Sequence, residues 1–145
     1  MKLVVQRVKK AQVEVREKIV GEIKRGLFVL VGIGQGDTKK QAEILAKKLV
    51  SLRIFEDENE KMNLDIKQVK GQILIISQFT LYGDCSSGNR PSFIQAARPE
   101  QAIPLYEYFI EQCKNQGVYV QTGIFGADMQ IEAQNDGPVT ILLEK

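Results

Sequence analysis

The 145-residue sequence contains no histidine and no tryptophan, and only two of its residues are cysteines. Without histidine there is no Ser-His or Cys-His nucleophile pair, no zinc site built on imidazole, and no side chain whose unperturbed pKa lies near neutral pH. An enzyme of this composition must work through backbone dipoles, hydroxyls, carboxylates, lysines or its substrate. Cys85 and Cys113 are too few for a disulfide framework, which favours a reducing, cytoplasmic setting.

Long apolar runs are absent as well. No segment approaches the ~20 apolar residues of a membrane span, and residues 1–13 alternate apolar and polar side chains. We therefore expect a first strand there and no signal peptide. The chain is 43% hydrophobic and 26% charged, as in ordinary globular proteins. Because no repeat or linker divides it, we predict one domain over residues 1–145.

The net charge is only +2, but its distribution is uneven. Residues 1–25 contain eight lysines and arginines against three glutamates. A basic edge can attract a phosphate backbone, although a solvated strand surface has the same composition. Charge alone leaves both interpretations open.

Hydrophobic periodicity predicts many strands and two helices. Strands are expected at residues 2–15, 19–23, 27–33, 53–55, 72–81, 118–122, 127–133 and 139–144. One helix should begin near Thr38, which has capping-box spacing with Gln41, and the other should run from Pro99 to about Asn115. We predict an α+β fold, a strongly curved, antiparallel-rich sheet or barrel covered by the two helices.

Hydrogen-bonding side chains interrupt the apolar strand expected at 72–81. The strand period of two places Gln78 and Thr80 on one face and Ser77 and Phe79 on the other. An unpartnered buried polar group costs about 1–3 kcal/mol, so these side chains either bond to nearby backbone or form a site. The residues alone do not decide between the two.

A second unusual segment, Asn135-Asp136-Gly137-Pro138, separates two apolar stretches. Asp-Gly favours a hairpin turn, but the proline removes an N–H where the hairpin ladder would begin. A Gly-Pro bond can be cis, which would suit a rigid main-chain probe. We predict a turn here and leave the isomer open.

Four ordered motifs resemble the D-aminoacyl-tRNA deacylases, also called D-tyrosyl-tRNA deacylases. They are SQFTLYGD at 77–84, RPSF at 90–93, FGADMQ at 125–130 and NDGPVT at 135–140, and similarity extends over the whole chain from VVQRV at 4–8. One departure is the loop 84–89, which has no Lys or Arg although this region is often basic in the family. A tRNA contact is then expected from Arg90 and the N-terminal strands.

The resemblance implies hydrolysis of the ester between a D-amino acid and tRNA, by a cytoplasmic homodimer with active sites at the subunit interface. It implies no metal and no cofactor. The catalytic pocket residues carried over are Ser77, Gln78, Phe79 and Thr80. The residues carried over for substrate binding and chiral selection are Gly137, Pro138, Met129 and Arg7. In the family the Gly-cisPro pair enters the partner's pocket and rejects L-amino acids, and the arginine holds its loop.

Two mechanisms and three functions stay open at this point. The N–H groups of Phe79 and Thr80 can form an oxyanion site, with the substrate's 2′-hydroxyl helping to activate water, or the Thr80 hydroxyl can be the nucleophile. Glycyl-tRNA should also be hydrolysed, because glycine has no side chain to exclude. The alternatives are a non-catalytic RNA-binding module on the same fold and a related deacylase for achiral or L-aminoacyl esters.

Overall fold

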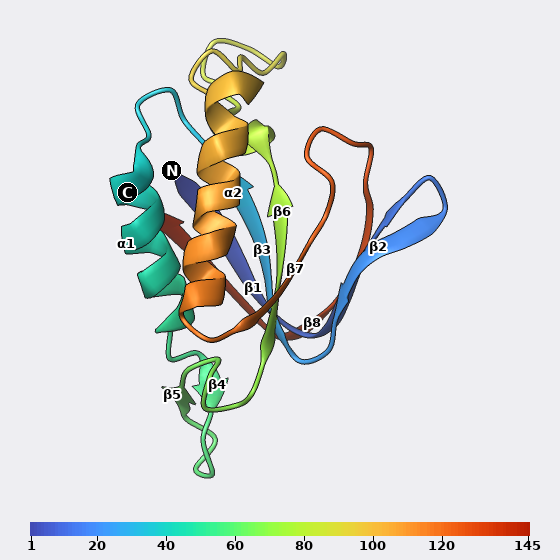
Figure 1. Ribbon diagram of the computed structural model, residues 1–145, viewed down its shortest axis with the longest axis vertical. Helices are drawn as coiled ribbons and strands as arrows, with labels where there is room; N and C mark the ends of the chain where they lie inside the picture. Colours follow the sequence, from blue (N-terminus) through green and yellow to red (C-terminus); the bar gives the residue numbers. More distant parts are fainter.

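The computed structural model describes residues 1–145 and is built around one mixed sheet (Figure 1). In chain order the elements are β1 (Lys2–Val15), β2 (Lys18–Ile23), β3 (Gly26–Gly32), α1 (Lys39–Val50), β4 (Phe55–Glu56), β5 (Met62–Leu64), β6 (Gln72–Ser77), the 3-10 helix η1 (Phe79–Tyr82), α2 (Pro99–Asn115), β7 (Tyr119–Thr122) and β8 (Gln130–Glu144). The long first strand and both helices confirm their predictions.

The strand β1 organises the sheet. One of its edges is shared by β3, which pairs with residues 2–8, and β2, which pairs with residues 11–15. The strand β8 pairs with the other edge, and all three pairings are antiparallel. The strands β3, β6 and β7 are parallel, since α1 and α2 lie in the crossovers between them. The strands β2 and β7 also contact each other, so the sheet is nearly closed, as predicted.

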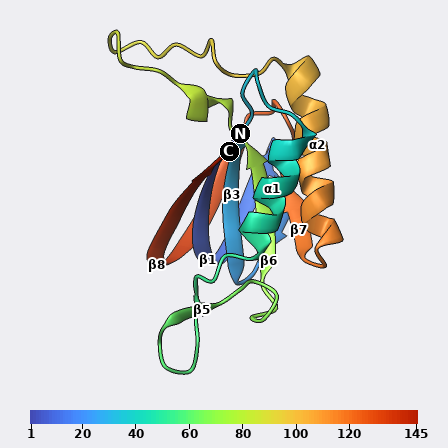
Figure 2. The same ribbon diagram turned by 90° about the vertical axis from the view of Figure 1, so that its left-hand side faces the viewer.

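Both helices cover the same face of the sheet (Figure 2). The helix α1 buries an apolar stripe made of Ala42, Leu45, Ala46, Leu49 and Val50. The predicted capping box is present, with the N–H of Lys40 donating to Thr38 Oγ1 and the N–H of Thr38 donating to the Gln41 side chain. The main core lies between helices and sheet, and a smaller cluster that includes Val13, Phe28 and Leu74 fills the curved sheet's other side.

The strand expected at 72–81 is shorter than predicted. It ends at Ser77, and the chain turns into η1, where the N–H of Leu81 donates to Gln78 O. The apolar residues Phe79 and Leu81 extended the strand pattern, but they belong to the helical turn. The predicted alternation of faces across residues 77–80 is therefore wrong.

The hairpin turn predicted at residues 135–138 is also wrong. The segments before and after it form one strand, β8, because both pair antiparallel with the same neighbour β1. Val8 pairs with Asn135 and Gln6 with Thr140, so residues 136–139 bulge out opposite Arg7 alone. The Gly137–Pro138 peptide bond within the bulge is cis.

Candidate active site

A cavity of about 570 Å³ lies at the carboxyl ends of the parallel strands. Its walls come from the ends of β3 and β6, from η1, from the beginning of α2 and from the segment between β7 and β8. In α/β sheets this edge is the usual place for ligands, because the connecting loops converge there. The size is that of a small-molecule site.

Four of the eight site residues expected from the sequence line this cavity, namely Ser77, Gln78, Phe79 and Met129. Thr80 lies beside them in η1, with an exposed side chain whose Oγ1 accepts a hydrogen bond from Gln78 Nε2. The site therefore contains a hydroxyl, an amide and an aromatic ring from consecutive residues. The segment folds this way because Gln78 N–H still donates to Val31 O (2.8 Å) before the chain leaves the sheet.

The first residues of η1 present open backbone donors. Its opening N–H groups, those of Phe79 and Thr80, have no acceptor inside the helix, since 3-10 bonds run back three residues. No loop carbonyl and no side chain accepts from either group. Two neighbouring N–H donors beside a cavity are the arrangement that stabilises an oxyanion.

The rings of Phe93 and Phe125 complete the cavity wall, and the sequence analysis did not assign them to the site. Phe93 packs edge-to-face on Phe79 with ring centroids 5.0 Å apart. Phe125 packs on Tyr106 with centroids 5.7 Å apart, and Tyr106 Oη donates to Ile75 O at 2.9 Å. Burial raises the pKa of the Tyr106 hydroxyl above its ordinary value, so the group stays protonated. Both phenylalanines lie in the motifs RPSF and FGADMQ, which were the available signal.

A glycine leaves room for Met129. A Cβ atom at Gly123 would lie 2.5 Å from Met129 Sδ and 3.0 Å from Ile76 Cδ1. The methionine therefore rests directly on the backbone after β7, where it reaches the cavity.

The other three expected residues form a second cluster on β1 and β8. Arg7 is only 4% exposed, and its Nη1 donates to Ile54 O at 2.8 Å while Nε donates to Asp136 O at 3.1 Å. Glu56 lies 3.5 Å from its Nη2. Gly137 has a φ of 124°, and a Cβ there would lie 3.1 Å from Arg7 Nη2. Arg7 thus fixes the bulge that contains Gly137 and Pro138.

Neither Gly137 nor Pro138 lines the cavity of its own chain. The structure brings Ser77, Gln78, Phe79, Thr80 and Met129 together, and it places Arg7, Gly137 and Pro138 apart from them. The grouping differs from the expected one at Met129, which was expected with Gly137, Pro138 and Arg7 but lies in the cavity wall with Ser77, Gln78 and Phe79.

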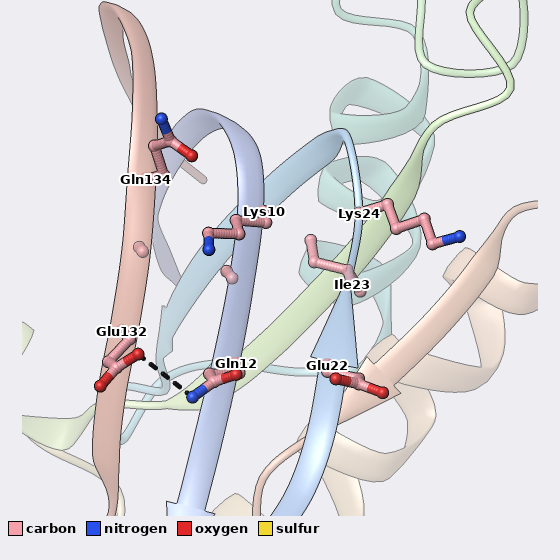
Figure 3. A pocket seen from close by; sticks show the side chains of 9 residues that line it. Lys10, Gln12, Glu22, Ile23, Lys24, Glu132 and Gln134 are labelled. Carbon is pink, nitrogen blue, oxygen red and sulfur yellow. Dashed lines mark hydrogen bonds between the residues drawn. The ribbon is translucent and has the colours of Figure 1, made fainter.

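A second hollow, of about 490 Å³, lies on the sheet between β1, β2 and β8 (Figure 3). Its charged lining residues are Lys10, Lys24, Glu22 and Glu132, and Gln12 Nε2 donates to Glu132 at 3.1 Å. It contains none of the expected site residues. No three acidic or cysteine side chains lie close enough together to hold a metal ion. Neither α1 nor α2 has the length and hydrophobicity that crossing a bilayer requires.

Comparison with known proteins identifies the family of this chain. The chain belongs to the D-Tyr-tRNA(Tyr) deacylase family, whose model matches residues 4–144. D-aminoacyl-tRNA deacylases of Koribacter versatilis and Thermosipho africanus are 58% and 54% identical to it, each over 99% of this chain and 97% of the relative. The protein hydrolyses D-aminoacyl-tRNA, as the sequence predicted.

Solved structures share the fold. One described as "c-Myc DNA Unwinding Element Binding Protein" has a TM-score of 0.93 and 43% identity, covering 100% of this chain and 99% of that one. Another, titled as a "probable eukaryotic D-amino acid tRNA deacylase", has a TM-score of 0.83 and 18% identity over 98% of this chain and 97% of that one. The latter similarity concerns the fold alone.

Proposed function

We propose that the cavity holds the 3′-terminal aminoacyl-adenosine of D-aminoacyl-tRNA and that its ester is cleaved beside Phe79 and Thr80. The observation that carries this proposal is the convergence of Ser77, Gln78, Phe79 and Met129 on one cavity with two open backbone donors. The phenylalanine rings of the cavity can pack against an amino acid side chain and a nucleobase. The polar residues at the end of β6 can form hydrogen bonds with the ester.

The chemistry assigned to this site is attack by water on the ester carbonyl. The Phe79 and Thr80 N–H groups stabilise the oxyanion, and one such donor contributes about 3–4 kcal/mol to lowering the barrier. The carbon–oxygen bond to the ribose then breaks, and the 3′-oxygen takes up a proton. The neighbouring 2′-hydroxyl of the substrate helps to activate the water, since the chain has no histidine to act as base.

The surroundings of Thr80 argue against its hydroxyl as nucleophile. Gln78 Nε2 donates to Oγ1, and no carboxylate or amine accepts the Thr80 proton. A nucleophilic hydroxyl needs such a base. Thr80→Val keeps the backbone donor and removes the hydroxyl, so we expect D-tyrosyl-tRNA hydrolysis within about threefold of wild type. Complete loss of turnover, with circular dichroism showing an intact fold, would instead identify Thr80 as the nucleophile.

The position of the site is tested by filling the cavity. Ala127 is half-buried in its lining, so Ala127→Trp should block hydrolysis of D-tyrosyl-tRNA. The matched control is Ala133→Trp, the same change in the second hollow (Figure 3), which should retain activity. If Ala127→Trp hydrolyses the ester normally, the cavity is not the active site. If the wild-type protein binds tRNA but hydrolyses neither the D- nor the L-ester, the result supports the alternative function, a non-catalytic RNA-binding module.

We further propose a homodimer in which the Gly137–Pro138 bulge of one subunit enters the cavity of the other. Support comes from the separation of bulge and cavity within one chain and from the firm anchoring of the bulge by Arg7. A rigid main chain in the direction of an L side chain rejects L-amino acids by steric exclusion. Glycyl-tRNA passes this filter, because glycine presents no side chain. The cytoplasm, where aminoacyl-tRNA is made, is the proposed location.

A further inference from the structure

We infer that Arg98 binds the phosphodiester on the 5′ side of the substrate's terminal adenosine. This inference rests on the proposal that the cavity holds the aminoacyl-adenosine. Among the 17 residues that line the cavity, Arg98 is the only charged one. The substrate end is an uncharged ester, sugar and base joined to a chain of phosphates. The first negative charge must therefore lie where this chain leaves the cavity.

The Arg98 guanidinium is free to bind an anion. The side chain is exposed at the N-cap of α2, makes no ion pair, and donates no hydrogen bond to the protein. By contrast, Arg7 and Arg53 use their donors on backbone carbonyls and on Asn63. A planar guanidinium with five donors matches two phosphate oxygens at once.

Hydrogen bonds on both sides of Arg98 fix its backbone in the cavity wall. Just before it, Ala97 N–H donates to Ile33 O at 2.8 Å, which ties the chain to the end of β3. Just after it, Arg98 O accepts from the N–H groups of Gln101 and Ala102 in the first turn of α2. The positive end of the α2 dipole adds to the attraction for an anion at the same place.

The direct test compares adenosine with adenosine 5′-monophosphate as inhibitors of D-tyrosyl-tRNA hydrolysis. In the wild type the monophosphate should inhibit roughly tenfold more strongly than adenosine, because it adds the charge that Arg98 binds. In Arg98→Gln the two should inhibit equally. Arg98→Gln should also raise KM for D-tyrosyl-tRNA and leave kcat unchanged, with the slope of log kcat/KM against log salt reduced by about 0.7.

The control variant is Arg53→Gln, which removes another exposed arginine, one that does not line the cavity. It should keep the preference for the monophosphate. Equal inhibition by both compounds in the wild type, or the same loss of preference in Arg53→Gln, overturns the role of Arg98. If neither compound competes with D-tyrosyl-tRNA, the failure lies in the proposed placement of the adenosine itself.

Discussion

At the scale of single residues, Arg7 is the buried charged side chain of this protein. Its guanidinium joins β1 to two distant segments: residues 54–56, through Ile54 O and Glu56, and the bulge in β8, through Asp136 O. We expect Arg7→Met to lower the free energy of unfolding by about 2–4 kcal/mol, because two carbonyls lose a charged donor. Urea denaturation measures this. The control is Arg53→Met, because Arg53 is exposed. An equal loss of stability there would show that the burial of Arg7 does not increase its contribution to the free energy of unfolding.

Asp57 gives a pH-dependent prediction at the same scale. Its carboxylate accepts hydrogen bonds from the N–H groups of Lys61 and Asn59, which hold its pKa below the ordinary 3.8. A lowered native pKa stabilises the fold above 3.8, and the effect disappears as pH falls through the native value. Asp57→Asn should therefore be less stable than wild type at about pH 7 and equal to it at about pH 2.

Chemical denaturation at the two pH values measures the difference in free energy of unfolding between wild type and Asp57→Asn. Glu58→Gln changes a neighbouring exposed carboxylate that accepts no hydrogen bond, so it serves as the control. A difference for Asp57→Asn that persists unchanged at low pH would contradict the electrostatic explanation.

At the scale of secondary-structure elements, β3 and β6 lie so close together at Gly26 that no side chain fits between them. A Cβ atom at Gly26 would lie 1.8 Å from Gln72 O and 2.7 Å from Gln72 N. Gly26→Ala should lower the free energy of unfolding by about 3 kcal/mol, since the strands must separate to admit the methyl group. Gly36→Ala is the control, because nothing lies within 4 Å of a Cβ there. Equal stability of both variants would contradict this close approach of the two strands.

Helices and strands with a regular spacing of apolar residues could be predicted from the sequence. The ends of strands that depend on tertiary contacts could not. The alternation of β1 and the apolar stripe of α1 specify each element locally. The end of β6 depends on the turn at Gln78, and the continuity of β8 depends on β1 pairing on both sides of the bulge. Asp136-Gly137 favours a hairpin locally, but the pairing with β1 prevails.

The candidate site could also be predicted only in part, namely for the residues at the end of a strand and not for those in loops. Consecutive polar residues at a strand end drew attention to Ser77, Gln78 and Thr80, and the structure gathers them beside the cavity. The rings of Phe93 and Phe125 arrive from loops, where no hydrophobic period indicates an inward direction. Arg98 belongs to none of the sequence motifs. It reaches the cavity because the preceding residue, Ala97, donates its N–H to Ile33 O just after β3.

At the scale of the whole molecule, β8 is an exposed edge strand. It pairs with β1 on one side, and its Leu142 is 75% exposed. Long apolar edge strands are usually covered, because their open backbone groups invite pairing with another chain. The same strand contains the Gly137–Pro138 bulge. The proposed homodimer would cover this edge if the second copy packs against the strand that contains the bulge.

The proposed exchange of bulges can be tested by mixing subunits. Pro138→Ala should loosen the rejection of L-tyrosyl-tRNA, whereas Ala127→Trp has a blocked cavity and an intact bulge. If the bulge acts in trans, refolding Pro138→Ala with about a fourfold excess of Ala127→Trp gives most Pro138→Ala cavities an intact partner bulge. L-tyrosyl-tRNA hydrolysis per Pro138→Ala chain should then fall severalfold, while D-tyrosyl-tRNA hydrolysis continues.

The matched control is the double variant Ala127→Trp/Pro138→Ala, which offers the same blocked cavity but an altered bulge. The same excess of this variant should leave L-tyrosyl-tRNA hydrolysis unchanged, because no intact bulge reaches the open cavities. Suppression by both proteins would mean that subunit exchange itself disturbs the site. Suppression by neither, with mixed dimers shown by mass spectrometry, would mean that each bulge guards the cavity of its own chain. The separation of Gly137 and Pro138 from that cavity favours action in trans.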